Sequence, residues 1–457
     1  MKKNTRLFSL AMGMCILGQS ATAANLNPRG TGQVLIYPYY TVNNDLNTLY
    51  SVVNTTADVK AVKVRFLEGD NGQEVLDFNV YLSPFDVWTA ALSASATGTD
   101  HFHVDTSCAP FLTTPQSFLN FAFVLDPGSD DEERVRDGHF EILEMGNITD
   151  PLLAAEATHV NGVPANCNAL AAAWSANGQW DIDPNDGLTP PTGGLFGHAI
   201  IIDVAEGTAI SYRADTIDDF YQQDVVSHAQ PGEFSPNLSS AKPQSVLIDS
   251  GEAIVSNWTT GEDAISALFL HKKIFNEYAL DSGINARTEW VITFPTKRFY
   301  VNGTSIRAPF NALFDGPDGA CEEYDYIVSN REAEIISESL LPPITPPRPP
   351  TFMCWNTNVF SLFNPLSNGG NSPVSSVLGS LNNYDLSTSP FSAGTIEMNF
   401  PEPASMVDND NTTYEGYPVT GFALQAYTNA NAQPGLLAQY ATLFNHKYSR
   451  TINQKTE

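Results

Sequence analysis

Apolar and polar residues alternate in two early segments of the chain. The segments are 62–66 and 76–82, with Gly69-Asp70-Asn71-Gly72 between them. Because successive side chains of a strand point to opposite faces, this pattern predicts a β-hairpin with one buried face. Further segments of strand character lie at 49–56, 86–92 and 118–125. Short strands at this spacing predict a β-sandwich.

A second region contains two similar segments, 138–145 and 197–204, which predict neighbouring strands of one sheet. The intervening connection of about 50 residues includes two helix signals. Asp150-Pro151 is typical of a helix start, and Ala169 to Ala176 followed by Gly178 predicts a short helix with its stop. A connection of this length is either a functional lobe or a tethered surface loop.

The rest of the chain gives weaker signals. Segment 262–279 has apolar residues at roughly helical spacing, but its run Ala267-Leu268-Phe269-Leu270 would equally suit a buried strand, so its type stays open. Residues 341–350 are proline-rich, which favours extended polyproline geometry in a semi-rigid linker or a hairpin crown. Strands are also predicted at 288–294, 395–400 and 421–427.

These elements predict a mainly β protein with one or more β-sandwich domains and a short helical insertion. The expected organisation is a β-sandwich domain at 24–130, a second β-rich domain at 131–340 with the insertion at about 146–196, the linker or crown at 341–350, and a C-terminal β- and loop-rich region at 351–457.

The segment 33–92 resembles the immunoglobulin-like β-sandwich modules of bacterial surface proteins. The likeness lies in Val52-Val53-Asn54-Thr55-Thr56, a strand that ends in Asn-Thr before a turn, and in the valine-alternating strand 62–66. Segments 33–40 and 290–297 are similar to those of a group of uncharacterised secreted proteins of Gram-negative bacteria. The resemblance implies fold and export, and it implies no particular function.

The N-terminus has the three parts of a secretory signal peptide. Basic residues at 2–6 precede the apolar run 7–17, and Ala21-Thr22-Ala23 forms a cleavage pattern. Cys15 raises the alternative of a lipoprotein, but Met14 stands where such signals have a small residue. We therefore predict a signal peptide at 1–23 and a secreted or cell-surface protein, with the periplasm as the alternative. The apolar run is shorter than a membrane-spanning helix, and no later stretch predicts a transmembrane segment.

The chain is acidic, with 51 Asp and Glu against 22 Lys and Arg and a formal net charge of −29. Cleavage after Ala23 removes three basic residues and no acid, so the mature chain is more negative still. Such a surface repels nucleic acid and anionic lipid. It favours solubility, and the alternative interpretation is binding of divalent cations.

Four cysteines remain after cleavage, and an even number in an exported chain predicts two disulfides. We predict Cys108–Cys167 and Cys321–Cys354, because each pair closes a loop-rich segment and neither crosses the middle of the chain. No pair has the C-x-x-C spacing, which argues against a zinc ribbon, a haem attachment site or a redox dithiol.

Two groups of residues are candidate metal ligands. His101 and His103 lie at alternate positions that would share one face of a strand, with His139 or His198 as a third ligand, although such histidines are often only hydrogen-bonded. The acidic loop 181–187 offers Asp181, Asp183 and Asp186 to calcium. Asp186 stands where an EF-hand requires glycine, and acidic residues such as these and those of 408–411 are also typical of turns.

Aromatic residues suggest a carbohydrate platform as one alternative and a buried core as the other. The candidate platform residues are Tyr37, Tyr39, Tyr40, Trp174 and Trp180. Trp88 and Trp290 lie inside strand-like segments and are assigned to the core.

No motif with local spacing identifies a reaction, since G-x-S-x-G, H-E-x-x-H and the glycine-rich nucleotide loops are absent from the sequence. We therefore expect a non-catalytic structural or adhesive protein of the bacterial cell envelope that contacts protein or glycan at the cell surface. The alternative is an extracellular module that binds glycan or a cation, and a weaker one is a secreted hydrolase whose site is assembled from distant residues.

Overall fold

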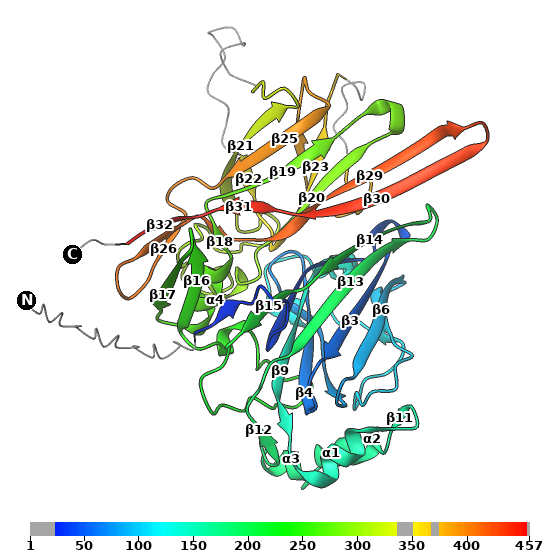
Figure 1. Ribbon diagram of the computed structural model, residues 1–457, viewed down its shortest axis with the longest axis vertical. Coiled ribbons are helices and arrows are strands. Elements are labelled where there is room, and N and C mark those ends of the chain that lie inside the picture. The colour runs from blue at the N-terminus through cyan, green and yellow to red at the C-terminus, as the bar shows by residue number, and fades with distance from the viewer. Residues whose placement is uncertain (1–22, 336–350, 367–373, 455–457) are drawn as a thin grey trace, which may run out of the picture.

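The computed structural model describes residues 23–335, 351–366 and 374–454 and is mainly β, which confirms the predicted fold class. Two β-sandwiches are stacked along the long axis, with short helices at one end (Figure 1). Residues 1–22 of the expected signal peptide and the proline-rich segment 341–350 lie outside the described residues.

The first sandwich contains a 7-stranded and a 6-stranded sheet. The 7-stranded sheet has the order β1 (Asn25–Leu26), β15 (Asp215–Asp218), β2 (Val34–Thr41), β9 (Asp137–Ile148), β4 (Val59–Glu68) and β5 (Glu74–Leu82), with β12 (Leu188–Thr189) paired to β9. The 6-stranded sheet has the order β14 (Thr208–Arg213), β13 (Leu195–Asp203), β3 (Asn47–Asn54), β6 (Val87–Ser95), β7 (Gly98–Phe102) and β8 (Gln116–Ser117).

The predicted early hairpin is formed by β4 and β5, in which Val62 pairs with Val80 and Val64 with Phe78. These apolar side chains enter the core between the two sheets, where Trp88 is also fully buried. The alternating pattern therefore identified the strands and the face that lines this core.

The expected boundary at residue 130 does not divide the sheets. β9, β13, β14 and β15 all follow it in the chain, yet they complete the two sheets that contain β2 and β3. Strand pairing over such sequence separations leaves no local trace in composition, so the sequence division placed the boundary too early.

The helical insertion contains α1 (Pro151–Ala157), α2 (Cys167–Ala173) and α3 (Gln179–Ile182), with the small hairpin of β10 (His159–Val160) and β11 (Val163–Pro164). As expected, a helix begins at Pro151, where the Asp150 carboxylate accepts hydrogen bonds from two backbone N–H groups of the first turn. Trp174 and Trp180 form a small separate core with Tyr81 and Met145 of the sheet. We call residues 150–187 the lobe.

A connecting region joins the two sandwiches. It contains the hairpin of β16 (Gln244–Asp249) and β17 (Glu252–Asn257), then α4 (Gly261–Phe269) and β18 (Leu270–His271), after which β19 (Lys273–Ala279) enters the second sandwich. Thr260 caps α4 by accepting from the backbone N–H of Asp263. The open choice for segment 262–279 is thus settled as a helix followed by strands.

The second sandwich consists of two 5-stranded sheets. One has the order β22 (Thr351–Met353), β21 (Glu322–Asn330), β25 (Ala393–Asn399), β19 and β31 (Lys447–Ser449), and the other β24 (Asn383–Ser387), β23 (Thr357–Phe363), β20 (Arg287–Thr293), β29 (Thr420–Gln433) and β30 (Leu436–Asn445). β26 (Ser405–Val407), β27 (Thr413–Glu415) and β32 (Thr451–Asn453) form a small sheet, and β28 (Tyr417–Pro418) pairs with β18. The short helix α5 (Arg298–Val301) follows β20, and 3₁₀ turns lie at η1 (Asn43–Asp45), η2 (Phe121–Leu125), η3 (Glu132–Arg136), η4 (Leu238–Ser240) and η5 (Ser282–Ile284).

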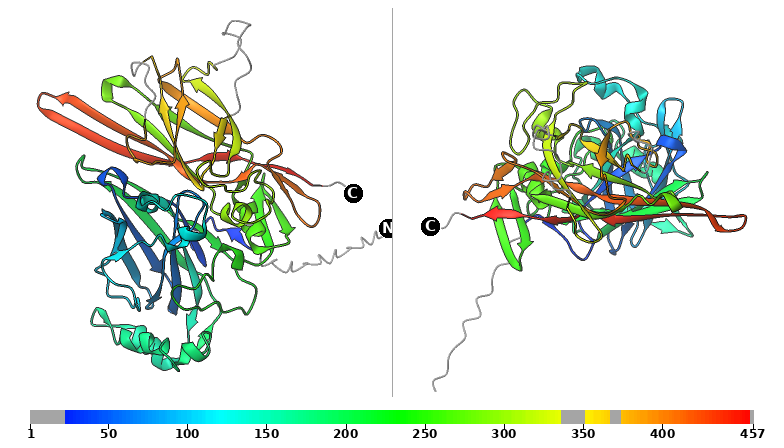
Figure 2. Two further views of the ribbon diagram at one scale, coloured as in Figure 1. Left: turned by 180° about the vertical axis from the view of Figure 1, so that it is seen from behind. Right: turned by 90° about the horizontal axis from the view of Figure 1, so that it is seen from above.

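The two sandwiches share a continuous apolar core. Val34, Ile36 and Leu143 on the outer face of the first sandwich pack in the same cluster as α4 and Trp290. The Thr293 hydroxyl also donates to the Pro38 carbonyl over 2.6 Å. Figure 2 shows the close stacking from two further directions. No helix in the described part of the chain is long and apolar enough to cross a membrane.

Candidate binding surface

One hairpin extends well beyond the second sandwich. β29 pairs with β20 from Thr420 to Ala426, and beyond Ala426 its pairing partner among the described strands is β30 alone. The two strands turn at Pro434-Gly435, where Gly435 has a φ of 77°, a conformation that suits glycine. We call residues 427–440 the arm, and Figures 1 and 2 show it projecting from the molecule.

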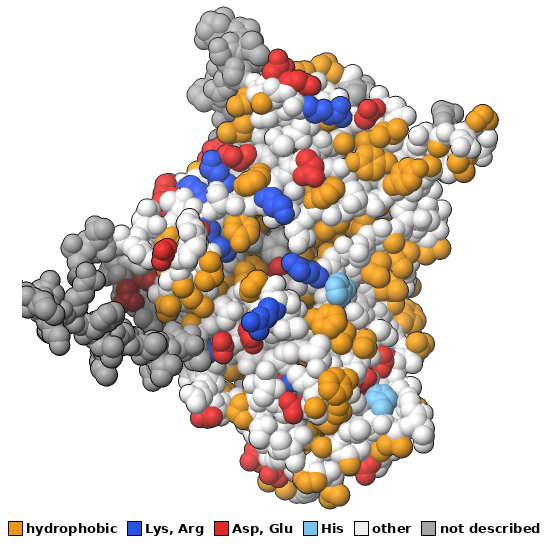
Figure 3. All heavy atoms as spheres, viewed as in Figure 1, with side chains coloured by type: hydrophobic (Ala, Val, Ile, Leu, Met, Phe, Trp, Pro, Cys, Tyr) orange, Lys and Arg blue, Asp and Glu red, His pale blue; other side chains and the backbone are white. Residues whose placement is uncertain are grey.

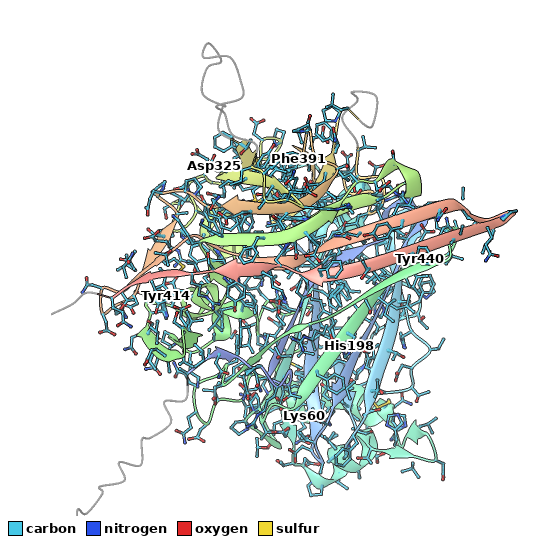
Figure 4. All side chains as sticks on the ribbon, turned by 45° about the horizontal axis from the view of Figure 1, so that its top comes forward. Lys60, His198, Asp325, Phe391, Tyr414 and Tyr440 are labelled. Carbon is cyan, nitrogen blue, oxygen red and sulfur yellow. A yellow bond between two sulfur atoms is a disulfide. The ribbon has the colours of Figure 1, made fainter. Side chains whose placement is uncertain are left out.

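The arm belongs to an uncharged part of an acidic protein. The segment from Thr420 to Asn445 contains no Asp, Glu, Lys or Arg, whereas 16% of the whole chain is charged. Leu436, Leu437 and Tyr440 are 48%, 54% and 58% exposed. Figure 3 shows hydrophobic side chains at the arm, and Figure 4 labels Tyr440 on it. Exposed edge strands usually carry charged residues, which prevent them from pairing with strands of other chains. The arm has no such charges, so nothing of this kind opposes the pairing.

The outer edge of β30 is the end of its sheet. β14 of the first sandwich lies beside part of β30, and no backbone hydrogen bond joins these two strands in the described structure. The Gln439 side chain of β30 donates a hydrogen bond to the Glu206 carboxylate in the turn between β13 and β14. The edge therefore keeps backbone donors and acceptors that another strand could use.

A groove of about 510 Å³ lies at the base of the arm. Its walls come from both sandwiches, with Ile201 and Ile210 on one side and Leu424 and Tyr440 on the other. Exposed apolar side chains and an open strand edge thus meet at a concave surface, which is the combination that peptide-binding sites use.

The aromatic residues proposed as a carbohydrate platform are all buried. Tyr37, Tyr39 and Tyr40 lie in the first core, and Trp174 and Trp180 lie in the lobe core. Trp290, like Trp88, is fully buried as predicted. The stacking platform is therefore not formed by these residues, because β2 and the lobe are covered on the faces that carry them.

The structure brings His101 and His103 together, with ring centres 6.2 Å apart. Burial, with the neighbouring His103, lowers the pKa of His101 to about 3. His139 instead lies between the sandwiches beside Asn356, and His198 is exposed on β13. Among the described residues there is no group of three or more His, Cys, Asp or Glu that could hold a metal ion.

The three acidic residues of the lobe stabilise local turns. The Asp181 carboxylate accepts from the Asn177 N–H over 2.8 Å, and that of Asp183 accepts from the Asn185 N–H over 3.0 Å. The backbone carbonyl of Asp186 accepts from the Trp180 indole. These contacts agree with the interpretation of the acidic residues as turn residues, and the three do not form a cluster of metal ligands.

Both predicted disulfides are present, Cys108–Cys167 and Cys321–Cys354. The first ties the lobe to the first sandwich, and the second joins the start of β21 to the end of β22. Disulfides of this kind are typical of proteins outside the cytoplasm.

Lys297, which lies in the turn between β20 and α5, is almost fully buried. Burial lowers the pKa of Lys297 to about 8, and its Nζ donates to the Ala320 carbonyl over 2.5 Å. Lys297 is enclosed by the rings of Phe294 and Phe310. We assign it to the support of the second core, since a catalytic amine needs access to substrate.

Sequence reasoning predicted a strand at 421–427 but missed the arm. The available signal was the absence of charge from residue 420 to residue 445 together with the Pro434-Gly435 turn. No protein-family model, curated protein or solved structure matches the chain.

Proposed function

We propose that this is an exported, non-catalytic binding protein of the bacterial cell surface or extracellular space, which attaches to other proteins through its arm. The observation that carries the proposal is the long hairpin with an open edge, exposed leucines and no charge. The expected signal peptide, the two disulfides and the resemblance to surface modules support the location.

The partner that fits this surface is an extended polypeptide segment. Unpaired backbone groups of β30 would form ladder hydrogen bonds with it. Because alternate residues of a strand share a face, its side chains on one face would cover Leu436 and Tyr440, and those on the other face would cover Leu437. A glycan would instead need stacked aromatic rings with polar neighbours, and the residues expected to supply that platform are buried. A protein partner is therefore favoured over a glycan.

The test places a charge on the arm. Leu437→Lys adds a cation to an exposed side chain, so the fold should persist while strand addition is opposed. Ile182→Lys is the matched control, because Ile182 is 74% exposed on the lobe. Expressing cells are separated into periplasm, cell surface and medium, and melting temperatures of the purified proteins are compared.

We expect the wild type and Ile182→Lys to remain at the cell surface and Leu437→Lys to move to the medium with an unchanged melting temperature. If all three proteins distribute alike, the arm does not mediate attachment. If the wild type is found only in the periplasm, the proposed location is wrong.

A further inference from the structure

Two histidines of the first sandwich each have a buried ring nitrogen without a partner. His101 lies in β7 and His103 follows it, and both pack among the aromatic rings at one end of the core. Nδ1 of His101 and Nε2 of His103 are buried and have no hydrogen-bond partner in the described part of the protein. Buried polar atoms are nearly always satisfied, so two such atoms in adjacent rings call for an explanation.

The other nitrogen of each ring is occupied, which fixes the rings. Nδ1 of His103 lies 3.2 Å from the Asp105 carbonyl oxygen and must donate to it, so Nε2 of His103 carries a lone pair. Nε2 of His101 lies 2.8 Å from the Tyr50 hydroxyl. The Trp88 indole donates to the same hydroxyl oxygen over 3.4 Å. An ion at Nδ1 of His101 requires the tautomer in which Nε2 also donates to Tyr50, because Nδ1 then carries a lone pair. Such second contacts are the usual means of orienting imidazole ligands.

The surroundings favour an ion of low charge. Trp88 lies 4.9 Å from the His103 ring and Phe78 lies 5.0 Å from the His101 ring. Aromatic faces attract cations, but an apolar site penalises charge, and the Born cost rises with the square of the charge. Zn²⁺ would also need four ligands, whereas no third His, Cys, Asp or Glu completes a cluster in the described residues.

We propose that His101 and His103 form a two-coordinate site for a soft monovalent cation, Cu(I), bound between Nδ1 of His101 and Nε2 of His103. A filled-shell monovalent ion accepts two imidazoles in a linear arrangement, and binding involves no change of oxidation state. Two metal–nitrogen bonds of about 2 Å and roughly 1 Å from each nitrogen to its ring centre place the rings about 6 Å apart. The observed separation of 6.2 Å matches this distance, and the proposed site requires the two nitrogens to face each other across it.

The site lies close to a route from solvent. His103 is only partly buried, and the next residue, Val104, is 97% exposed. The ion would enter past this loop, and Trp88 would sense its arrival through its contact with the His103 ring. The disulfide-bonded cysteines leave no free thiol among the four of the mature chain to compete for the ion.

The experiment uses protein recovered after export, with intact mass confirming that Cys15 has been removed. Cu(I) under anaerobic reducing conditions, and Ag(I) as a redox-inert analogue, are titrated against a competing chelator, with native mass spectrometry and tryptophan fluorescence as readouts. His103→Ala tests the site, and His198→Ala is the control because His198 is an exposed histidine of the same sandwich (Figure 4). Trp88→Phe identifies the reporting indole.

We expect one Cu(I) or Ag(I) per wild-type chain with quenched fluorescence, the same in His198→Ala, and at least a 100-fold loss of affinity in His103→Ala. Trp88→Phe should bind the ion with a smaller fluorescence change. His101→Phe, which keeps the core filled, should repeat the loss seen in His103→Ala. The proposal is overturned if the wild type binds neither ion, or if His103→Ala binds with wild-type affinity.

Discussion

Three cations of β4, Lys60, Lys63 and Arg65, are fully buried. Each meets a carboxylate, with Lys60 2.6 Å from Glu144, and Arg65 3.0 Å from Glu141. Lys63 also donates to backbone carbonyls of the connecting segment 230–235. Buried charges are tolerated when they are paired, so these residues hold that segment against the sheet.

The polar side chains of β4 show what the alternating sequence pattern could not predict. Alternation predicted one buried face and one polar face, and the apolar face is where it was expected. The polar face is also buried, because the connecting segment and the second sandwich cover it. A strand pattern reports which side chains share a face, but it does not report what packs on that face. Tyr37 and Tyr40 are instead buried in the core between the sheets of the first sandwich, and Tyr39 packs against Phe422 of the second sandwich.

We predict that Lys60→Ala lowers the free energy of unfolding by about 3 to 5 kcal/mol, because it leaves the Glu144 carboxylate buried without its cation. Lys60→Met combined with Glu144→Gln should recover much of this loss. Urea unfolding of the three proteins measures the effect. Lys273→Met removes a half-exposed ion pair with Glu397 and should cost less than about 1 kcal/mol. Equal losses of unfolding free energy in Lys60→Ala and Lys273→Met would contradict the stabilising role assigned to the buried pair of Lys60 and Glu144.

His228 makes the attachment of the lobe sensitive to acid. Its ring contacts Trp174 and Trp180, and burial lowers its pKa to about 4. The pKa of histidine in the unfolded chain is about 6.5. As the pH falls, the unfolded state therefore binds a proton at this residue before the folded state does. Stability from this group is therefore complete above about pH 6.5 and falls as the pH drops toward 4.

We predict that His228→Asn loses less stability than the wild type between pH 7 and pH 4.5, by about 3 kcal/mol or less from the size of the pKa difference. Urea midpoints at the two pH values provide the measurement. His198→Asn, at an exposed position, should keep the wild-type pH dependence. An unchanged slope in His228→Asn would show that the other buried histidines account for acid sensitivity.

At the scale of elements, the lobe is too short to be stable alone. Its helices contain 7, 7 and 4 residues, well below the length at which isolated helices persist. The ring of Trp180 stacks on Tyr81 with centroids 5.2 Å apart, and the Cys108–Cys167 disulfide closes a separation of 59 residues. The structure of the lobe therefore depends on packing against the sheet and on the disulfide.

We predict that Cys108→Ser with Cys167→Ser destabilises the protein by about 4 kcal/mol in the chain-entropy view of a loop of this size. Limited proteolysis should then cleave the lobe between α1 and α2 faster than in the wild type. Cys321→Ser with Cys354→Ser serves as the comparison and should leave the rate of lobe cleavage unchanged. Equal cleavage of the lobe in all three proteins would assign its order to packing alone.

Element boundaries were predictable where the pattern was strong. The start of the first lobe helix followed from Asp150-Pro151, and segment 262–279 held a helical and a strand signal because it contains both elements in succession. The far half of β29 was missed, since its Asn, Ala and Gln residues alternate little. Its strand conformation depends on pairing with β30, which is tertiary information.

At the scale of the whole molecule, the two sandwiches are joined by charge as well as by apolar packing. Arg298 of α5 lies 3.2 Å from Glu141 of β9, the same carboxylate that Arg65 binds. These residues are widely separated in the chain, so composition and linker signals could not reveal the contact. The sequence placed separate domains where the structure has two sandwiches with a shared core.

We predict that Arg298→Met uncouples the sandwiches. It removes the cation from a buried cluster that also holds Glu74 and Glu141, leaving excess negative charge at the interface. The free energy of unfolding should fall by about 3 kcal/mol or more, and calorimetry should resolve two transitions, whereas we expect one for the wild type. Adding Glu141→Gln to Arg298→Met removes the excess charge, so the double variant should regain part of the stability and the single transition. A single unshifted transition in Arg298→Met would mean that the apolar core alone couples the sandwiches, since Val34, Ile36 and Leu143 remain in place in every variant.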